Sequence, residues 1–307
     1  MTLRVTFLGT SGAIPTAERN PSAIHLNREG EQLLFDCGEG TQRQMMRFST
    51  GFSISRICLT HVHGDHVLGL PGLLQTLDFN DRAEPLTIHT PRGTADNVRR
   101  LISALDTRPA FSLEIEEVGE GDLVHRGEEY EIRTFPTEHR TRSVGYALIE
   151  DDRKGRFDRE RAEELGVPVG PAFGRLHAGE PVELEDRVVE PEEVVGPPRP
   201  GRRFVYTGDT RPADATIDAA RGADLLIHDA TFGDDWADRA RETGHSTARE
   251  AGALAREAGV ERLALTHVSS RYAGDASRLA REARESLSGG EAFVADDGME
   301  IDVPFPE

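Results

Sequence analysis

The sequence predicts a layered α/β fold in which two β-sheets pack together and helices cover their outer faces. Two observations support this prediction. The first half of the chain is dominated by short apolar runs typical of strands, whereas strands and helices alternate from Phe204 onward. Several of these runs also end at a histidine or an aspartate, which places polar side chains where strands end.

The first half is expected to contain more strands than helices. Strands are expected at residues 3–8, 23–26, 32–35, 85–90, 123–134 and 143–149, and helices at residues 67–77 and 93–104. This arrangement indicates a largely β-structured half with helices packed outside it.

The second half is expected to alternate. Strands are expected at residues 204–207, 225–228 and 263–266, with helices between and after them. One helix has a clear start, because Thr247 and Glu250 form a T-x-x-E capping box before an alanine-rich run that ends at Gly259.

Residues 151–202 differ in character from the rest of the chain. They are rich in charge, glycine and proline, with one short helix expected at residues 159–165. A stretch of about 50 residues is too long for a routine connection. It is either a solvated excursion, partly disordered, or a protruding arm that grips a partner, and composition alone favours neither.

The charge balance is strongly acidic. The 307 residues include 55 acidic and 36 basic side chains, a net charge of −19, and Lys154 is the only lysine. An acidic surface on which arginine replaces lysine resembles proteins adapted to a salt-saturated cytoplasm. At about 1 M salt the Debye length is only about 3 Å, so long-range repulsion is screened.

Three features predict a cytoplasmic protein without a membrane segment. No stretch approaches the roughly 20 apolar residues of a membrane span. The amino terminus, MTLRVTFLGT, carries no signal-peptide pattern. Cys37 and Cys58 cannot form a disulfide framework, which fits a reducing compartment.

The most informative segment is residues 57–66, an apolar run that stops at His61, His63, Asp65 and His66. Imidazole nitrogen and carboxylate oxygen are the ligands of a catalytic zinc that keeps one coordination position open. Ordinary core or surface roles seldom place three histidines and an aspartate within six positions. The segment therefore predicts a metal-dependent hydrolase.

Three further candidate ligands each follow a strand-like run: His139, Asp209 and His267. Singly, each could be a capping aspartate or a hydrogen-bonded histidine, but the repeated context favours ligation. Six groups would suit two metals if Asp209 bridged them. One metal would be held by His61, His63 and His139, and the other by Asp65, His66 and His267. Two metals roughly 3.5–4 Å apart can activate a shared water for attack on a phosphorus or a carbonyl.

The pattern His-x-His-x-Asp-His, followed by a distant His, Asp and His, resembles the metallo-β-lactamase superfamily. This resemblance implies a four-layer αββα sandwich. The superfamily includes lactamases, thioesterases, phosphodiesterases and nucleases, so the fold does not name the substrate. More specific segments, FDCGEGTQRQM (35–45), FDRERAEELGVPVGP (157–171) and GHSTAREA (244–251), resemble the ribonuclease Z family in its short form.

The ribonuclease Z resemblance implies a single metallo-β-lactamase-fold domain over residues 1–307, with a protruding tRNA-binding arm inserted at about residues 151–190. It implies two zinc ions per subunit, with manganese or another divalent metal as an alternative, and a homodimer. The implied reaction removes the 3′ trailer from precursor tRNA and leaves a tRNA 3′-hydroxyl and a 5′-phosphate trailer. Two other readings remain: a small-molecule zinc phosphodiesterase or thioesterase, and a non-catalytic tRNA-binding subunit.

The resemblance also assigns roles. Asp65 would accept or orient the proton of the attacking water, and His245 would protonate the departing 3′ oxygen as general acid, a role worth roughly 10²–10⁴-fold in rate. The implied substrate-binding residues are Arg19, Gly170, Pro171, Ser246 and Thr247. Two positions depart from the family: Ala17 replaces a loop lysine, and Asp229 replaces a glutamate in the segment 228–231. The first departure leaves open how the acceptor end is sensed.

Overall fold

The computed structural model describes residues 2–104 and 109–306. The chain forms two compact units: Met1–Ile149 with Arg202–Pro304, and Glu150–Gly201 with Phe305–Glu307. No helix in the described ranges is long and apolar enough to cross a membrane.

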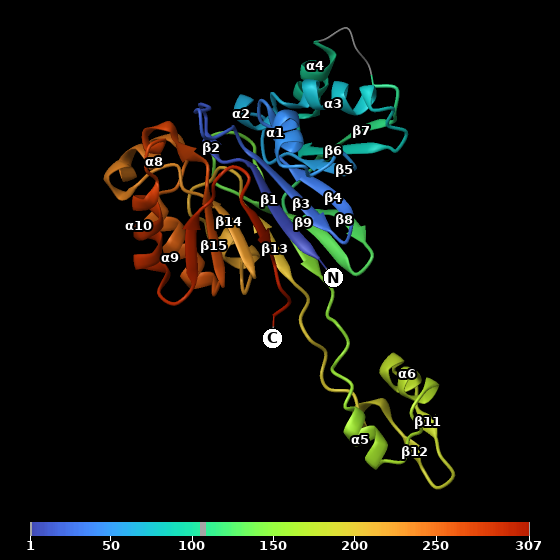
Figure 1. Cartoon of the computed structure of the whole chain (residues 1–307). Coiled ribbons are helices and arrows are strands. Elements are labelled where there is room, and N and C mark those ends of the chain that lie inside the picture. The colour runs from blue at the N-terminus through green and yellow to red at the C-terminus, as the bar shows by residue number, and fades with distance from the viewer. Residues whose placement is uncertain (1, 105–108, 307) are drawn as a thin grey trace. The chain divides into compact units, whose positions relative to one another are not determined.

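The first unit contains a seven-stranded sheet in the order β18-β1-β3-β4-β5-β6-β7 (Figure 1). Its strands are β1 (Leu3–Gly9), β3 (Ala23–Arg28), β4 (Glu31–Phe35), β5 (Ile54–Cys58), β6 (Leu86–Pro91), β7 (Leu113–Val118) and β18 (Glu300–Asp302). β4 to β7 run parallel, whereas β1 pairs antiparallel with β3 and with β18. The parallel strands therefore end at one shared edge.

A second seven-stranded sheet of the same unit has the order β17-β15-β14-β13-β10-β9-β8. Its strands are β8 (Leu123–Gly127), β9 (Tyr130–Pro136), β10 (Val144–Glu150), β13 (Arg203–Tyr206), β14 (Leu225–Asp229), β15 (Arg262–Thr266) and β17 (Glu291–Val294). β13, β14, β15 and β17 are parallel. Every residue of β14 is buried, as expected for a parallel strand covered on both faces.

Apolar side chains fill three layers of core in this unit. The core between the sheets includes Phe35, whose ring centroid lies 5.8 Å from that of Tyr146 and 5.3 Å from that of Phe204. Outside the first sheet lie α1 (Thr41–Arg47), α3 (Leu70–Phe79) and α4 (Ala95–Ser103). Outside the second lie α7 (Asp214–Ala219), α9 (Ala248–Ala258) and α10 (Ser277–Leu287) (Figure 1). This αββα order confirms the predicted fold class.

Short elements complete the first unit. They are β2 (Ser11–Gly12), which pairs with β16 (Val268–Ser269), together with α2 (Gly64–Val67), α8 (Ala237–Thr243), η2 (Asp234–Trp236) and η3 (Ser270–Tyr272).

The predicted start of α9 is confirmed, and one predicted strand is wrong. The Thr247 side chain accepts a hydrogen bond from the Glu250 N–H, the Glu250 carboxylate accepts one from the Thr247 N–H, and Gly259 ends the helix at φ 67°. Residues 123–134 form two strands, β8 and β9, rather than one. Gly127 pairs with Tyr130 across a two-residue turn, and Glu129 adopts φ 59° there. The turn carries neither Asn-Gly nor Asp-Gly, so the usual hairpin signal was missing.

The second unit has its own small apolar core. Its elements are α5 (Arg159–Glu164), α6 (Pro171–Ala178), β11 (Val182–Glu183), β12 (Val188–Val189) and η1 (Pro191–Glu193). Its core consists of Ala162, Val167, Leu176, Val182, Val189 and Val194. The expected short helix is present as α5, but disorder of this stretch is contradicted by the packed core. The unit continues to Gly201 because Phe157 pairs with Val195, and Arg153 with Arg199.

Candidate metal centre

Seven polar side chains meet where strands of the two sheets end. They are His61, His63, Asp65 and His66 after β5, His139 after β9, Asp209 after β13 and His267 after β15. Ligands of open α/β sheets gather beyond the carboxyl ends of strands. The ligand atoms of His61, His63, His139 and Asp209 lie within 4.8 Å of one another, and so do those of Asp65, His66 and His267.

Asp209 lies between the two groups and is 2% exposed. Its Oδ2 is 3.5 Å from His61 Nε2 and 3.8 Å from His139 Nε2. Its Oδ1 is 3.3 Å from His66 Nε2 and 3.2 Å from His267 Nε2. One carboxylate oxygen therefore faces each group, which is the arrangement a bridging ligand requires.

Gly208 allows this approach. It adopts φ 60°, and a Cβ at this position would lie 2.6 Å from the Cβ of Thr60. Any side chain at residue 208 would therefore push the Asp209 turn away from the segment that carries His61.

The buried atoms of this cluster fit a divalent cation. His66 Nε2 and Asp209 Oδ1 are buried and have no hydrogen-bond partner in the described structure. His63 Nδ1 lies 3.0 Å from His61 Nε2 and 3.3 Å from His139 Nε2, so ring nitrogens point at one another. A buried polar atom without a partner is costly, and a shared cation satisfies several such atoms together. The donor set of imidazoles and carboxylates suits zinc and similar metals.

The other nitrogen of each buried ring is held by the protein. His139 Nδ1 donates to the Gly244 carbonyl at 2.8 Å, and His66 Nδ1 donates to Asp36 Oδ2 at 2.8 Å. His267 Nδ1 donates to Thr231 Oγ1 at 2.8 Å. Such bonds fix the tautomer and direct the free nitrogen toward the centre of the cluster.

Asp36 is a functional residue that the sequence reasoning missed. It directly follows β4, is fully buried, and has an unusual φ of 56° for a residue other than glycine. Besides His66, its carboxylate accepts hydrogen bonds from the Thr60 N–H at 2.7 Å and the Tyr206 hydroxyl at 2.8 Å. Its place immediately after an apolar strand is the same signal that identified the ligands.

We expect Asp36→Ala to weaken metal binding by about 10–100-fold, because His66 would lose the group that orients its ring. Titration of the metal-free variant with zinc, followed by calorimetry, measures the change. Asp36→Asn keeps the side-chain volume and serves as the matched control for packing. Wild-type zinc affinity in Asp36→Ala would show that Asp36 does not orient the ligand.

Electrostatics keep the carboxylates of the centre charged. Burial opposes ionisation of Asp209 and Asp65, but neighbouring histidines outweigh it and hold the pKa of both carboxyls below the usual range. Burial also opposes a charged His66, yet Asp209 and Asp36 raise its pKa well above the ordinary value. A metal must displace that proton, so metal affinity falls as the pH falls.

His245 lies beside the cluster and is paired with a second aspartate. Its Nδ1 donates to Asp229 Oδ2 at 2.9 Å, and its ring stacks on His267 with centroids 5.0 Å apart. Burial alone would lower the pKa of His245, but Asp229 and then Asp209 raise it to about 9. Asp229 is itself fixed, because its Oδ1 accepts from the N–H and the hydroxyl of Thr231. The sequence named Asp229 only as a departure from the family and gave it no role.

Three of the residues expected to bind substrate have hydrogen-bond partners within the protein. Arg19 is 7% exposed, and its guanidinium donates to Thr10 Oγ1, the Ala295 carbonyl and Asp296. Ser246 Oγ donates to the Thr210 carbonyl, and Thr247 caps α9. Substrate binding by Arg19, Ser246 and Thr247 stays a prediction, and these contacts show what holds their side chains in the folded chain. Gly170 and Pro171 lie in the second unit, at the start of α6.

Comparison with known proteins identifies relatives along the whole chain. A family model described as anti-Pycsar protein Apyc1 matches residues 3–154, and a beta-lactamase superfamily domain matches residues 194–268. The chain is 64% identical to a ribonuclease Z of Halorubrum lacusprofundi over 308 residues, covering 100% of this chain and 99% of that protein. It is 53% identical to a ribonuclease Z of Methanosarcina acetivorans, with 99% of each covered.

Solved structures agree with these relatives. The short form of human tRNase Z matches with a TM-score of 0.72 and 30% identity, covering 98% of this chain and 100% of that one. A metallo-beta-lactamase fold protein of Bacillus subtilis, YhfI, matches with a TM-score of 0.71 and 20% identity, covering 98% and 100%. The second likeness concerns the fold alone.

Proposed function

The chain belongs to the ribonuclease Z family, and on that basis we propose that it is an endoribonuclease that removes the 3′ trailer from precursor tRNA. Cleavage leaves a 3′-hydroxyl on the tRNA and a 5′-phosphate on the trailer. The observation that carries the proposal is the position of Asp209, with one carboxylate oxygen toward each of two ligand groups and His245 alongside. This arrangement suits hydrolysis of a phosphodiester.

The residues of the centre are assigned to two zinc ions. His61, His63 and His139 would hold one ion, Asp65, His66 and His267 would hold the other, and Asp209, which faces both groups, would be shared. When bound, the ions supply Lewis-acid chemistry that activates water and stabilises charge on the attacked phosphate. Histidine nitrogen and carboxylate oxygen favour zinc, with manganese or another divalent metal as the alternative.

Two side chains of the protein, His245 and Asp65, are assigned to the proton transfers of the reaction. His245 Nδ1 donates a hydrogen bond to Asp229. Its Nε2 is therefore left to donate a proton to the departing 3′ oxygen of the tRNA. Asp65 Oδ2 accepts from the Ala13 N–H at 2.8 Å and lies 3.2 Å from His267 Nε2. These contacts fix the Asp65 carboxylate at the centre, where it orients the attacking water.

The second unit is assigned to tRNA binding, at the turn before α6. Val169 is 63% exposed there, and no atom lies within 4 Å of a Cβ built on Gly170. The arginines of α5 are paired with acids of the same helix, Arg159 with Glu163 and Arg161 with Glu164. Contact through the open turn at Gly170 and Pro171 fits this charge pattern better than a cluster of free cations.

The assembly and the cellular setting are part of the same proposal. We assign the protein to a homodimer in the cytoplasm of a halophilic cell. The net charge of −19 and ribonuclease Z relatives in Halorubrum lacusprofundi and Natronomonas pharaonis support the high-salt setting. Light scattering in molar salt tests the dimer, and a monomeric mass would exclude it.

Incubation with precursor tRNA that carries a 3′ trailer tests the function. We expect a single cut that yields a tRNA 3′-hydroxyl and a 5′-phosphate trailer, complete loss of cleavage with a chelator, and recovery after zinc is added. Because phosphate contacts release counterions, binding should weaken as salt rises. End mapping of the products, at several salt concentrations, reads the outcome. Cleavage that survives the chelator, or cuts spread along any single strand, would contradict the assignment.

A further inference from the structure

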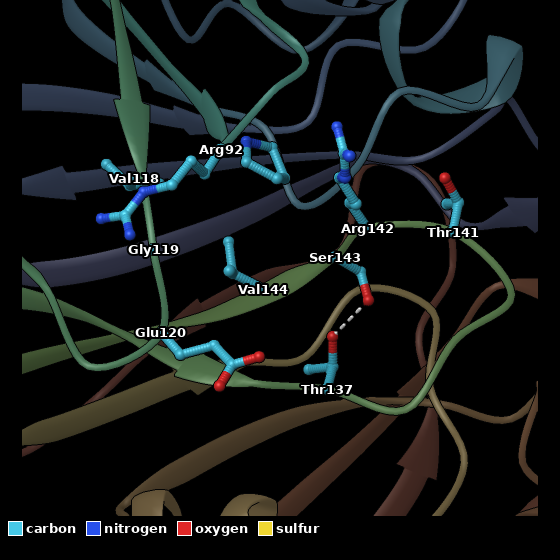
Figure 2. Close-up of a pocket in the computed structure, with 10 residues that line it drawn as sticks. Arg92, Val118, Gly119, Glu120, Thr137, Thr141, Arg142, Ser143 and Val144 are labelled. Carbon is cyan, nitrogen blue, oxygen red and sulfur yellow. Dashed lines mark hydrogen bonds between the residues drawn. The ribbon is translucent and has the colours of Figure 1, made fainter.

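We propose that a polar pocket beside the metal centre binds the first unpaired nucleotide of the trailer; this proposal rests on the proposed function. The pocket lies between the ends of β6 and β7 and the segment that joins β9 to β10 (Figure 2). Its volume is about 490 Å³. Pockets of about 300–1,000 Å³ accommodate ligands of nucleotide size, whereas a base-paired stem is far wider.

The pocket and the metal centre are built from the same segments of chain. Thr137 lines the pocket two residues before His139. On the other side, the N–H of Val144 donates to the carbonyl of Thr60 at 2.9 Å, and Thr60 precedes His61. An RNA strand that is cut at the metal centre can therefore extend into this polar pocket.

Two arginines give the pocket the chemistry of a phosphate site. Arg142 is exposed, its Nη1 donates to the Gly93 carbonyl at 3.0 Å, and no carboxylate partner is recorded for it among the described residues. Arg92 donates to Asp122 Oδ2 at 3.3 Å, and 72% of its side chain is exposed. In a chain with 55 acidic and 36 basic residues, the Arg142 guanidinium, without an acidic partner among the described residues, is available for a phosphate, and Arg92 lies exposed beside it.

Arg99, on the helix α4, is an exposed arginine that differs from Arg142 in having an acidic partner. Its Nη1 is bound to Asp96 at 3.0 Å, and the residue does not line the pocket. Arg99 therefore supplies a matched control for Arg142.

The remaining polar groups fit a ribose rather than a second phosphate. In Figure 2 the Glu120 carboxylate lies across the pocket from Arg142. The negative charge of Glu120 disfavours a phosphate on its side of the pocket, so the phosphate would lie at the arginines. The Glu120 carboxylate can accept a hydrogen bond from a 2′-hydroxyl, the group that distinguishes RNA from DNA. Thr137 Oγ1 donates to Ser143 Oγ at 2.7 Å, so both hydroxyls are fixed in place. None of the described residues that line the pocket is aromatic, so a nucleotide would be held there through its phosphate and ribose rather than by stacking of its base.

The unpaired trailer is favoured over the base-paired acceptor stem by the size of the pocket. In a precursor the acceptor stem is base-paired up to the discriminator, and the nucleotides after the cleavage point are unpaired. Only an unpaired nucleotide can enter a hollow of about 490 Å³ and present its phosphate and 2′-hydroxyl to opposite walls.

Steady-state kinetics of Arg142→Ala and the double variant Arg92→Ala/Arg142→Ala test the proposal. With a precursor that carries a trailer, we expect KM to rise about tenfold in the double variant, with kcat nearly unchanged and a salt dependence weaker by about one phosphate contact. Mature tRNA, which lacks the trailer, should inhibit all forms equally. Hydrolysis of bis(p-nitrophenyl) phosphate and the zinc content should stay at the wild-type level. Arg142→Lys should recover part of the loss, and Arg99→Ala should behave as wild type.

Two results would overturn the pocket assignment while leaving the proposed function intact. One is an unchanged KM for the precursor in the double variant. The other is an equal loss of affinity for mature tRNA, which would place the tRNA body in the pocket. Failure of the wild-type protein to cut the precursor is a different result, because it would reject the proposed function itself.

Discussion

Alanine in place of His245 should lower the rate of precursor cleavage by about 10²–10⁴-fold, the usual contribution of a general acid. The imidazole lies next to the centre, stacked on His267, but is held by Asp229 rather than by the ligand groups. Removing it deletes the proposed proton donor for the departing 3′ oxygen and leaves the seven proposed ligand side chains in place. Single-turnover cleavage of precursor tRNA measures the rate, and metal analysis confirms that the zinc content is unchanged.

Two further variants separate the proton donor from its neighbours. Asp229→Asn keeps the imidazole but removes the carboxylate that orients it, so its rate should fall between those of wild type and His245→Ala. His125→Ala removes a partly exposed histidine on β8, outside the cluster, and should cleave as wild type. Full activity in His245→Ala would remove this residue from the mechanism.

The ligand positions could be predicted from the sequence because each follows an apolar run that had to become a buried strand. β5 leads to His61 and β15 leads to His267, and parallel strands bring such ends to one edge. The local pattern was enough to find these residues. It was not enough to find what holds them, since the partners of Asp36 come from Thr60, His66 and Tyr206, distant segments that only the folded chain unites.

The partners of Arg19 could not be found from the sequence for the same physical reason. An arginine in a polar loop near a family motif is expected to face solvent or substrate. In the fold its guanidinium is buried against Ala295 and Asp296, which are more than 270 residues away in sequence. Nothing in the segment around Arg19 indicates acceptors near the other end of the chain. Long-range burial of a charged side chain is therefore the part of the site that sequence reasoning could not reach.

Removal of the second unit should separate tRNA cleavage from the chemistry of the centre. We expect a deletion of residues 158–194 to lower precursor cleavage by at least about 100-fold, mainly through KM, because the turn at Gly170 and Pro171 would be lost. Hydrolysis of bis(p-nitrophenyl) phosphate should remain near the wild-type rate. Loss of precursor cleavage with retained hydrolysis of the small substrate supports a tRNA-processing endonuclease over a small-molecule phosphodiesterase, because the latter would not need the second unit.

The structure makes this deletion feasible. Phe157 and Val195 form an antiparallel bridge, and the Asp158 N–H donates to the Val194 carbonyl at 2.7 Å, so Asn-Gly can join the two segments as a two-residue turn. The core of the second unit is drawn entirely from its own residues, and none of the three cores of the first unit includes a residue of 150–201. We therefore expect the shortened protein to keep its zinc and its thermal unfolding midpoint.

A point variant tests the turn without removing the unit. Gly170 has φ 140°, a conformation that side chains other than glycine rarely adopt, and a Cβ there would meet no atom within 4 Å. Gly170→Ala should therefore change the backbone of the turn without a steric clash and raise KM for the precursor in the same direction as the deletion. Gly274→Ala, at a position that is also open but lies in the first unit and has no positive φ, is the matched control. Wild-type KM in both the deletion and Gly170→Ala would mean that the first unit alone recognises tRNA, and the assignment of the second unit to tRNA binding would be rejected.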